Sequence, residues 1–177
     1  MALQASQPDN KNFLSPIGFR FSIQKLPHVN YFCTTASVPD ITMGQIDTLD
    51  TPFIKLPMPG DKLQFAPLAL SFRIDEDLNN YREIYDWLIS LGYPDNFAQH
   101  ARFQRPNPNN AGSDTVFSDA SLIIMTNQYK PNIEVKFIDL YPISLSSVDF
   151  TIEQSNVEYL NAQVQFVYRK YELITIS

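Results

Sequence analysis

The residues that could carry out chemistry in this chain are few and scattered. The chain has two histidines, His28 and His100, and one cysteine, Cys33. A nucleophile needs a base beside it, and a zinc site needs several Cys and His ligands at short spacing. Both histidines fall in segments typical of a turn or loop, and Cys33 falls in a strand pattern, where it is typical of a small buried side chain. We therefore expect no catalytic residues, no cofactor and no zinc site, and we predict that the protein is not an enzyme.

A second candidate is the acidic run Asp-Glu-Asp at residues 75–77. Three adjacent carboxylates could bind a hard cation. The run also directly precedes a helical pattern, and the positive partial charge of a helix N-terminus favours acids there without any metal. We prefer the helix start and predict no metal site. For an alternative enzyme or ligand-binding function, the candidate residues are Glu83, Asp86 and His100.

These acids lie in the most regular segment of the chain, residues 68–92. Alternating apolar residues over 68–74 predict a strand with one buried face. The apolar spacing then changes to three and four residues, which predicts a helix over about 77–91 that ends at Gly92. The predicted apolar stripe of this helix is Leu78, Tyr81, Ile84, Tyr85 and Leu88. The candidate outward helix face is Arg82, Glu83 and Asp86. The pattern leaves open whether Trp87 packs in the core or anchors a partner.

Most of the remaining chain alternates with the two-residue period of strands. Residues 17–26 and 31–36 predict a first hairpin. Further strands are predicted over 121–126, 133–140, 147–153 and 158–173, with a corner at 141–142. Eight or nine strands and one helix predict a mainly β fold, an antiparallel barrel or sandwich with one flanking helix. No repeat or composition shift divides the chain, so we predict a single domain over 1–177.

Three segments do not fit the core of a monomer. Residues 1–12 are polar and are expected to form an N-terminal arm, and residues 95–119 form a long polar loop. Residues 40–62 combine prolines, which exclude a central strand, with apolar side chains that need burial. An extended hairpin covered by a neighbouring molecule satisfies both constraints. Its candidate subunit-interface residues are Met43, Ile46, Phe53, Ile54, Leu56 and Met58. We interpret this combination as a sign that the protein functions in an assembly.

Composition argues against several other functions. The formal net charge of −6 is opposite to the clustered Lys and Arg of a surface that grips nucleic acid. No run approaches the roughly 18 apolar residues of a membrane-spanning helix, and the first residues lack the pattern of a signal peptide. A single cysteine cannot form an intrachain disulfide. We therefore expect a protein that folds in a cytoplasm and has no membrane partner.

From Gly18 to Leu173 the chain resembles the tail tube proteins of contractile-tailed, T-even-like bacteriophages. The segment GFRFSIQKLPHVNYFCTTASVP is similar to their opening hairpin, and LSFRIDEDLNNYREIYDWL is similar to their strand, acidic turn and helix. The long hairpin lies between these two segments. The segment DLYPISLSSVDFTIEQSNVEYLNAQVQFVYRKYEL is similar to their closing strands. The pieces occur in the family's order.

The resemblance implies a structural virion protein that is made in the cytoplasm of a host bacterium. Such subunits form hexameric rings that stack head-to-tail into a tail tube, with tail sheath, baseplate and tail terminator proteins as partners. It also implies that genome DNA passes through the lumen without specific binding, and an acidic lumen would suit the net charge of −6. The alternatives are a baseplate tube-initiator ring protein, or a tube component of a phage-like or type VI injection system.

Overall fold

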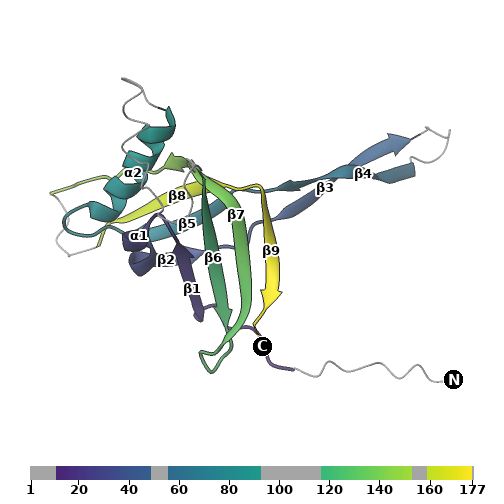
Figure 1. Ribbon diagram of the computed structural model, residues 1–177, viewed down its shortest axis with the longest axis horizontal. Helices are drawn as coiled ribbons and strands as arrows, with labels where there is room; N and C mark the ends of the chain where they lie inside the picture. Colours follow the sequence, from purple (N-terminus) through teal and green to yellow (C-terminus); the bar gives the residue numbers. More distant parts are fainter. Residues whose placement is uncertain (1–10, 49–55, 93–116, 153–158, 177) are drawn as a thin grey trace, which may run out of the picture.

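Figure 1 shows the computed structural model of the chain, which describes residues 11–48, 56–92, 117–152 and 159–176. Within these ranges the chain forms nine strands and two helices. In chain order they are β1 Phe19–Ile23, α1 Pro27–Phe32, β2 Cys33–Ala36, β3 Ile41–Thr48, β4 Leu56–Phe65, β5 Leu68–Arg73, α2 Asn79–Gly92, β6 Ser118–Met125, β7 Pro131–Leu145, β8 Asn161–Val167 and β9 Lys170–Thr175. The strand pairs are antiparallel. The prediction of a mainly β sandwich with a flanking helix is confirmed, although the strands do not close into a barrel.

Strand β7 belongs to two sheets because it bends in its middle. It pairs with β6 up to Leu140 and with β9 up to Ile138, whereas Tyr141–Leu145 pairs with β8. Near this change of partners Asp139 has φ of 56°, a conformation that Asp tolerates better than most residues. Sheet A therefore consists of β1, β6, the first part of β7 and β9. Sheet B consists of β2, β5, β8 and the end of β7.

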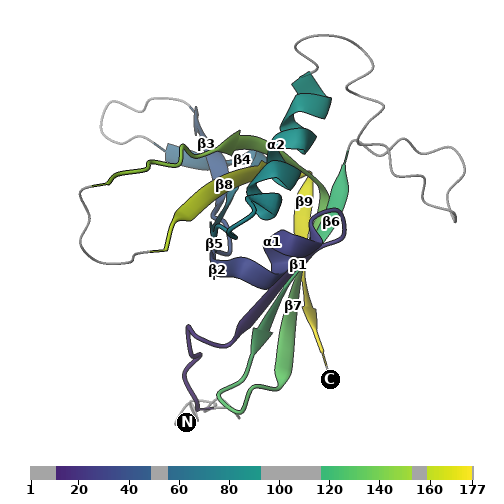
Figure 2. The ribbon, with the colours of Figure 1, turned by 90° about the vertical axis from the view of Figure 1, so that its left-hand side faces the viewer.

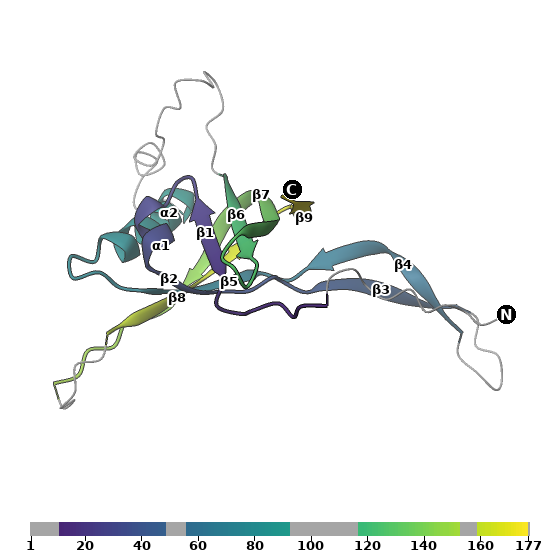
Figure 3. The same ribbon diagram turned by 90° about the horizontal axis from the view of Figure 1, so that it is seen from below.

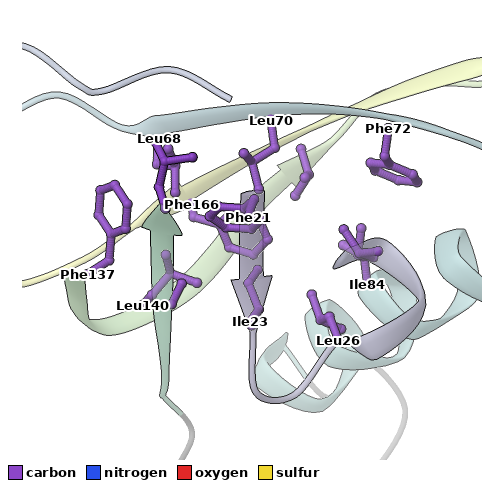
Figure 4. Packing of buried hydrophobic residues seen from close by; sticks show 14 of the residues in the cluster. Phe21, Ile23, Leu26, Leu68, Leu70, Phe72, Ile84, Phe137, Leu140 and Phe166 are labelled. Atoms are coloured by element: carbon purple, nitrogen blue, oxygen red, sulfur yellow. The ribbon is translucent and has the colours of Figure 1, made fainter. Parts of the chain in front are cut away.

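The core lies between the two sheets. The alternation predicted over 68–74 is confirmed, because Leu68, Leu70 and Phe72 are fully buried and Ile74 packs at the edge of the core. Side chains from β5, β1 and the helices converge there (Figure 4). Sheet A, sheet B, the helices and the residue before α1 all contribute large buried side chains. These include Phe21, Ile23, Phe137, Leu140, Leu68, Leu70, Phe72, Phe166, Leu26, Ile84 and Trp87. Burial of this apolar surface is the main stabilising contribution to the fold.

Helix α2 is confirmed, and it lies beside α1 (Figure 2). Asp75, the first residue of the acidic run, contacts the start of this helix. The Asn80 backbone N–H donates to Asp75 Oδ1 at 3.2 Å, and the Asp75 N–H is 3.4 Å from Asn80 Oδ1. This reciprocal arrangement satisfies backbone donors that a helix N-terminus otherwise leaves open. Glu76 and Asp77 precede the helix and do not lie in its first turn. The helix start therefore accounts for Asp75 alone, and the prediction is not confirmed for Glu76 and Asp77.

The buried face of α2 differs from the predicted stripe. Trp87 is fully buried, with its ring centroid 6.1 Å from that of Phe166. Tyr85 and Leu78, which the stripe included, are 51% and 40% exposed. The helix is rotated so that its largest apolar side chain enters the core, which removes more apolar surface from water than burying Tyr85 would. Trp87 is therefore a core residue.

The predicted first hairpin is wrong. Strand β1 pairs with β6 in sheet A, and β2 pairs with β5 in sheet B. Helix α1 connects them, and it begins at Pro27, a position where the missing N–H of proline costs nothing. The chain therefore crosses from one sheet to the other at this point.

The prediction for the closing strands is also corrected. The described part of 147–153 is not a strand, because the β7–β8 ladder ends near Ser146 and no strand ladder of the described ranges includes residues 147–152. The single strand predicted over 158–173 is two strands, β8 and β9, separated at Tyr168 and Arg169. The chain leaves sheet B and enters sheet A there, and Arg169 bonds Asp139 Oδ2 at 3.1 Å at the bend of β7.

Candidate functional site

The residues with reactive side chains do not come together. Cys33 packs against the core, and burial raises the pKa of its thiol to about 11, so it stays protonated at neutral pH. His28 lies on α1, and His100 lies outside the described residues. Within the described ranges, no group of three or more His, Cys, Asp or Glu residues could hold a metal ion. No helix of the described part is long and apolar enough to cross a membrane.

The candidate outward face of α2 divides into two parts. Arg82 and Asp86 are exposed, with Arg82 Nε 3.7 Å from Asp86 Oδ2. The prediction for Glu83 is wrong: its side chain is 18% exposed, and its Oε1 is 2.5 Å from Nδ1 of His28. Glu83 therefore joins α2 to α1. Sequence spacing could not indicate this contact, because His28 lies on a helix that was not predicted. A contact of Arg82 and Asp86 with another subunit remains a prediction.

The hairpin predicted over 40–62 is confirmed as a two-stranded arm made of β3 and β4. It extends away from the sandwich, on the side opposite to the helices (Figures 1 and 3). Its base is anchored, because the Phe65 ring packs on Tyr168 and Tyr171 at centroid distances of 6.0 and 5.5 Å. The Ala66 N–H also donates to Asp40 O at 3.0 Å. Beyond the base, β3 and β4 pair with each other and with no other strand of the described part.

The arm carries exposed apolar side chains. Of the candidate interface residues, Met43 and Met58 are 55% and 53% exposed. Ile41 and Leu63, which lie outside the candidate set, are exposed to similar extents. Cross-strand pairing is the signal for Leu63, because it lies opposite Met43. Ile46 and Leu56 are placed by their backbones in the ladder, opposite Met58 and Thr48. Phe53 and Ile54 lie outside the described residues, as do residues 1–10 of the predicted N-terminal arm and 95–116 of the long loop.

Among the described residues, both sheets end in strands that have a partner on one side only. In sheet B these are β2 and the segment Tyr141–Leu145 of β7, and in sheet A they are β1 and β9. An unpaired edge presents a row of free N–H and C=O groups that can bind another chain. Ile143, in the sheet B edge of β7, is 45% exposed. The described surface therefore offers one projecting apolar arm and several open edges.

A sequence model of the family described as phage tail tube protein matches residues 4–174. The chain belongs to the phage tail tube protein family. Proteins of this family are structural, which confirms the prediction that the chain is not an enzyme. The resemblance found in the sequence is thereby confirmed as well. No curated protein matches the chain.

Solved structures share the fold of this tail tube family member at low sequence identity. The cap that terminates the tube of the anti-feeding prophage aligns with a TM-score of 0.65 and 17% identity, over 99% of this chain and 100% of that chain. The sheath–tube complex of the PVC extracellular contractile injection system aligns with a TM-score of 0.60 and 14% identity, over 94% of each chain. The sheath/tube terminator of PVC aligns with a TM-score of 0.61 and 16% identity, over 93% of this chain and 99% of that chain.

Proposed function

We propose that this tail tube protein is the main tube subunit of a contractile phage tail. Six copies form a ring, rings stack head-to-tail, a contractile sheath surrounds them, and genome DNA passes through the lumen. The observation that carries this proposal is the free-standing apolar arm on a sandwich with open strand edges. A monomer would expose both to water, whereas head-to-tail assembly covers both.

Sheet B supplies a geometry for closing a ring. Its four strands alternate in direction, so β2 and Tyr141–Leu145 of β7 run antiparallel to each other at opposite edges. When a rotated copy brings its β2 beside this end of β7, the new pair is again antiparallel. Such a contact uses two different surfaces and can repeat around an axis until it closes. Ring closure then leaves no free edge in sheet B, and its uncovered face lines the lumen.

The arm and α2 take the remaining contacts in this arrangement. The arm, with Met43 and Met58, reaches the neighbouring ring, where its apolar side chains become buried. Arg82 and Asp86 of α2 face the sheath. The fold shared with the PVC sheath–tube complex supports this proposal, because that structure is a complex of a sheath and a tube.

A ring at one end of the tube is the second candidate. Two solved end assemblies, the anti-feeding prophage cap and the PVC sheath/tube terminator, also contain proteins with this fold. Their TM-scores of 0.65 and 0.61 are similar to the 0.60 of the PVC sheath–tube complex. A baseplate initiator ring and a tube component of another injection system use the same contacts. Copy number decides between the main tube and an end ring. We expect the chain to be among the most abundant proteins of purified particles, close to one copy per sheath subunit, and a faint band would assign it to an end ring.

Two glycines offer a matched test of the arm. Gly44 and Gly60 lie opposite each other where the β3–β4 register shifts, and a Cβ on Gly60 would lie 2.5 Å from the Gly44 carbonyl oxygen. A Cβ on Gly44 would meet nothing within 4 Å. Gly60→Ala should distort the arm at a cost of about 1–3 kcal/mol per subunit, which would raise the concentration needed for assembly by about 5- to 150-fold.

Sedimentation velocity over a concentration series measures this effect, and thermal melting should show an unchanged sandwich. The control Gly44→Ala is expected to assemble like the parent chain. Equal assembly of both variants would show that the shape of the arm does not matter to the tube.

A further inference from the structure

The two sheets differ sharply in charge. The strands of sheet B, β2, β5, β8 and Tyr141–Leu145 of β7, contain no Asp, Glu or Lys and a single arginine, Arg73. The strands of sheet A carry charges throughout. These are Arg20, Asp119, Glu134, Lys136, Asp139, Lys170 and Glu172. The net negative charge of the protein therefore does not come from sheet B.

The outward face of sheet B is nevertheless polar. Its residues alternate with the buried ones, so cross-strand partners share a face. One row consists of Ala69, Gln165 and Ser144, and the next consists of Thr35, Ser71 and Gln163. Apart from the half-buried Ser71, these side chains are exposed. In the last row Arg73 lies opposite Asn161, and its guanidinium lies 5.5 Å from the Tyr159 ring centroid. The face thus presents amide and hydroxyl groups with one cation at its end.

Such a face is unusual for either ordinary role of a protein surface. Apart from Ile143 at its β7 edge, it lacks the large exposed apolar side chains that a tight subunit contact buries. It also lacks the mixed charges that keep a solvent-facing sheet soluble. Neutral amides and hydroxyls bind water well but create no long-range field. A polymer that slides along them meets no ionic attraction that would hold it and no repulsion that would slow its entry.

We propose that this face is the wall of the tube channel and that the wall is not acidic. The inference rests on the proposed function, and it differs from the acidic lumen expected from the net charge. DNA phosphates pass amide and hydroxyl groups, and one belt of Arg73 side chains per ring is the charge that the wall contributes. The nearest described acids flank the strands and lie at the rims of the channel: Asp40 follows β2, the run 75–77 follows β5, and Asp149 follows β7.

The electrical potential at the wall can be measured with charged thiol reagents. In a Cys33→Ser, Gln165→Cys chain the single thiol lies in the middle of the face. Assembled tubes are treated at low salt with cationic and anionic methanethiosulfonates of similar size, and the rate of thiol modification is measured for each reagent. The cation-to-anion ratio of these rates is divided by the ratio that the same two reagents give with free 2-mercaptoethanol. Salt of about 0.01 M leaves charges within about 30 Å unscreened. A probe at Thr35→Cys replaces Gln165→Cys if that variant does not assemble.

We expect a normalised cation-to-anion ratio at or below about one, which Arg73→Gln should bring to within about twofold of one, because it removes the single charge that the strands of sheet B carry. A matched Gln163→Glu variant adds one carboxylate per subunit beside the probe and should raise the ratio about tenfold. A ratio above about three without that substitution would mean an acidic wall and would overturn the proposal.

Position is checked with a polyethylene-glycol maleimide too bulky for the channel. It should modify Arg82→Cys on α2 in tubes but leave Gln165→Cys unmodified, while the small reagents reach both. If the bulky reagent modifies Gln165→Cys in tubes, or if assembly protects that thiol from all reagents, the face is outer surface or subunit contact, and the inference fails. Absence of tubes from the parent chain would instead contradict the proposed function, so the two failures are distinguishable.

Discussion

A chain in which residues 43–63 are replaced by Asn-Gly is expected to be a folded monomer that cannot assemble. Thr42 and Gln64 are partners in the β3–β4 register, so a two-residue turn can join them. The base of the arm, where Phe65 packs on two tyrosines, is retained. The removed residues contribute no buried side chain to the described core. Circular dichroism should show a cooperative thermal transition, and sedimentation velocity should show a single monomeric species.

The control for the shortened chain keeps the arm and changes its apolar side chains. Met43→Ser with Met58→Ser leaves the backbone ladder in place and removes exposed apolar surface from it. We expect this variant to assemble more weakly than the parent chain, at higher concentration. An unfolded shortened chain would mean that the arm belongs to the core. A shortened chain that still forms long tubes would mean that ring stacking does not need the arm.

The second large effect is expected at Trp87. Its side chain is fully buried against Phe166, and the Lys25 Nζ lies 5.3 Å from the centre of its ring. Trp87→Ala removes this contact and leaves a cavity between α2 and sheet B, which should lower the free energy of unfolding by about 3–5 kcal/mol. Urea unfolding of the shortened, monomeric chain measures it without interference from assembly.

The matched control is Tyr85→Ala, two residues away on the same helix. Tyr85 is 51% exposed, and surface changes of this kind alter stability by about 0.5 kcal/mol or less. If Tyr85→Ala were the more damaging substitution, α2 would pack with the stripe suggested by sequence spacing, and the observed rotation of the helix would be wrong.

Local periodicity was enough to predict the elements whose signal lies within a few residues. The strand at 68–74, helix α2 and the arm at 40–62 are all present. Pairing between distant segments left no local signal, so β1 was paired with its neighbour in sequence, although its partner β6 lies about a hundred residues further on. Alternation over 147–153 was also misleading, because a strand needs a partner and the ladder had already ended there.

The candidate assembly surface could be predicted only where its signal lies within one segment of the chain. Met43 and Met58 stood out because prolines and apolar residues conflict within one segment. The Glu83 contact could not be found, since it depends on how α1 and α2 lie together. The charge difference between the sheets is present in the sequence, but it becomes visible only after each strand has been assigned to its sheet.

Electron cryo-microscopy of the purified, full-length chain tests the central claim most directly. The account predicts hollow rods of stacked six-membered rings, in which β2 of one subunit pairs with Tyr141–Leu145 of the next and sheet B forms a continuous wall around the lumen. The arm of each subunit should lie against the adjacent ring. A chain that stays monomeric at high concentration, or rings joined through β1 and β9 of sheet A, would contradict the account.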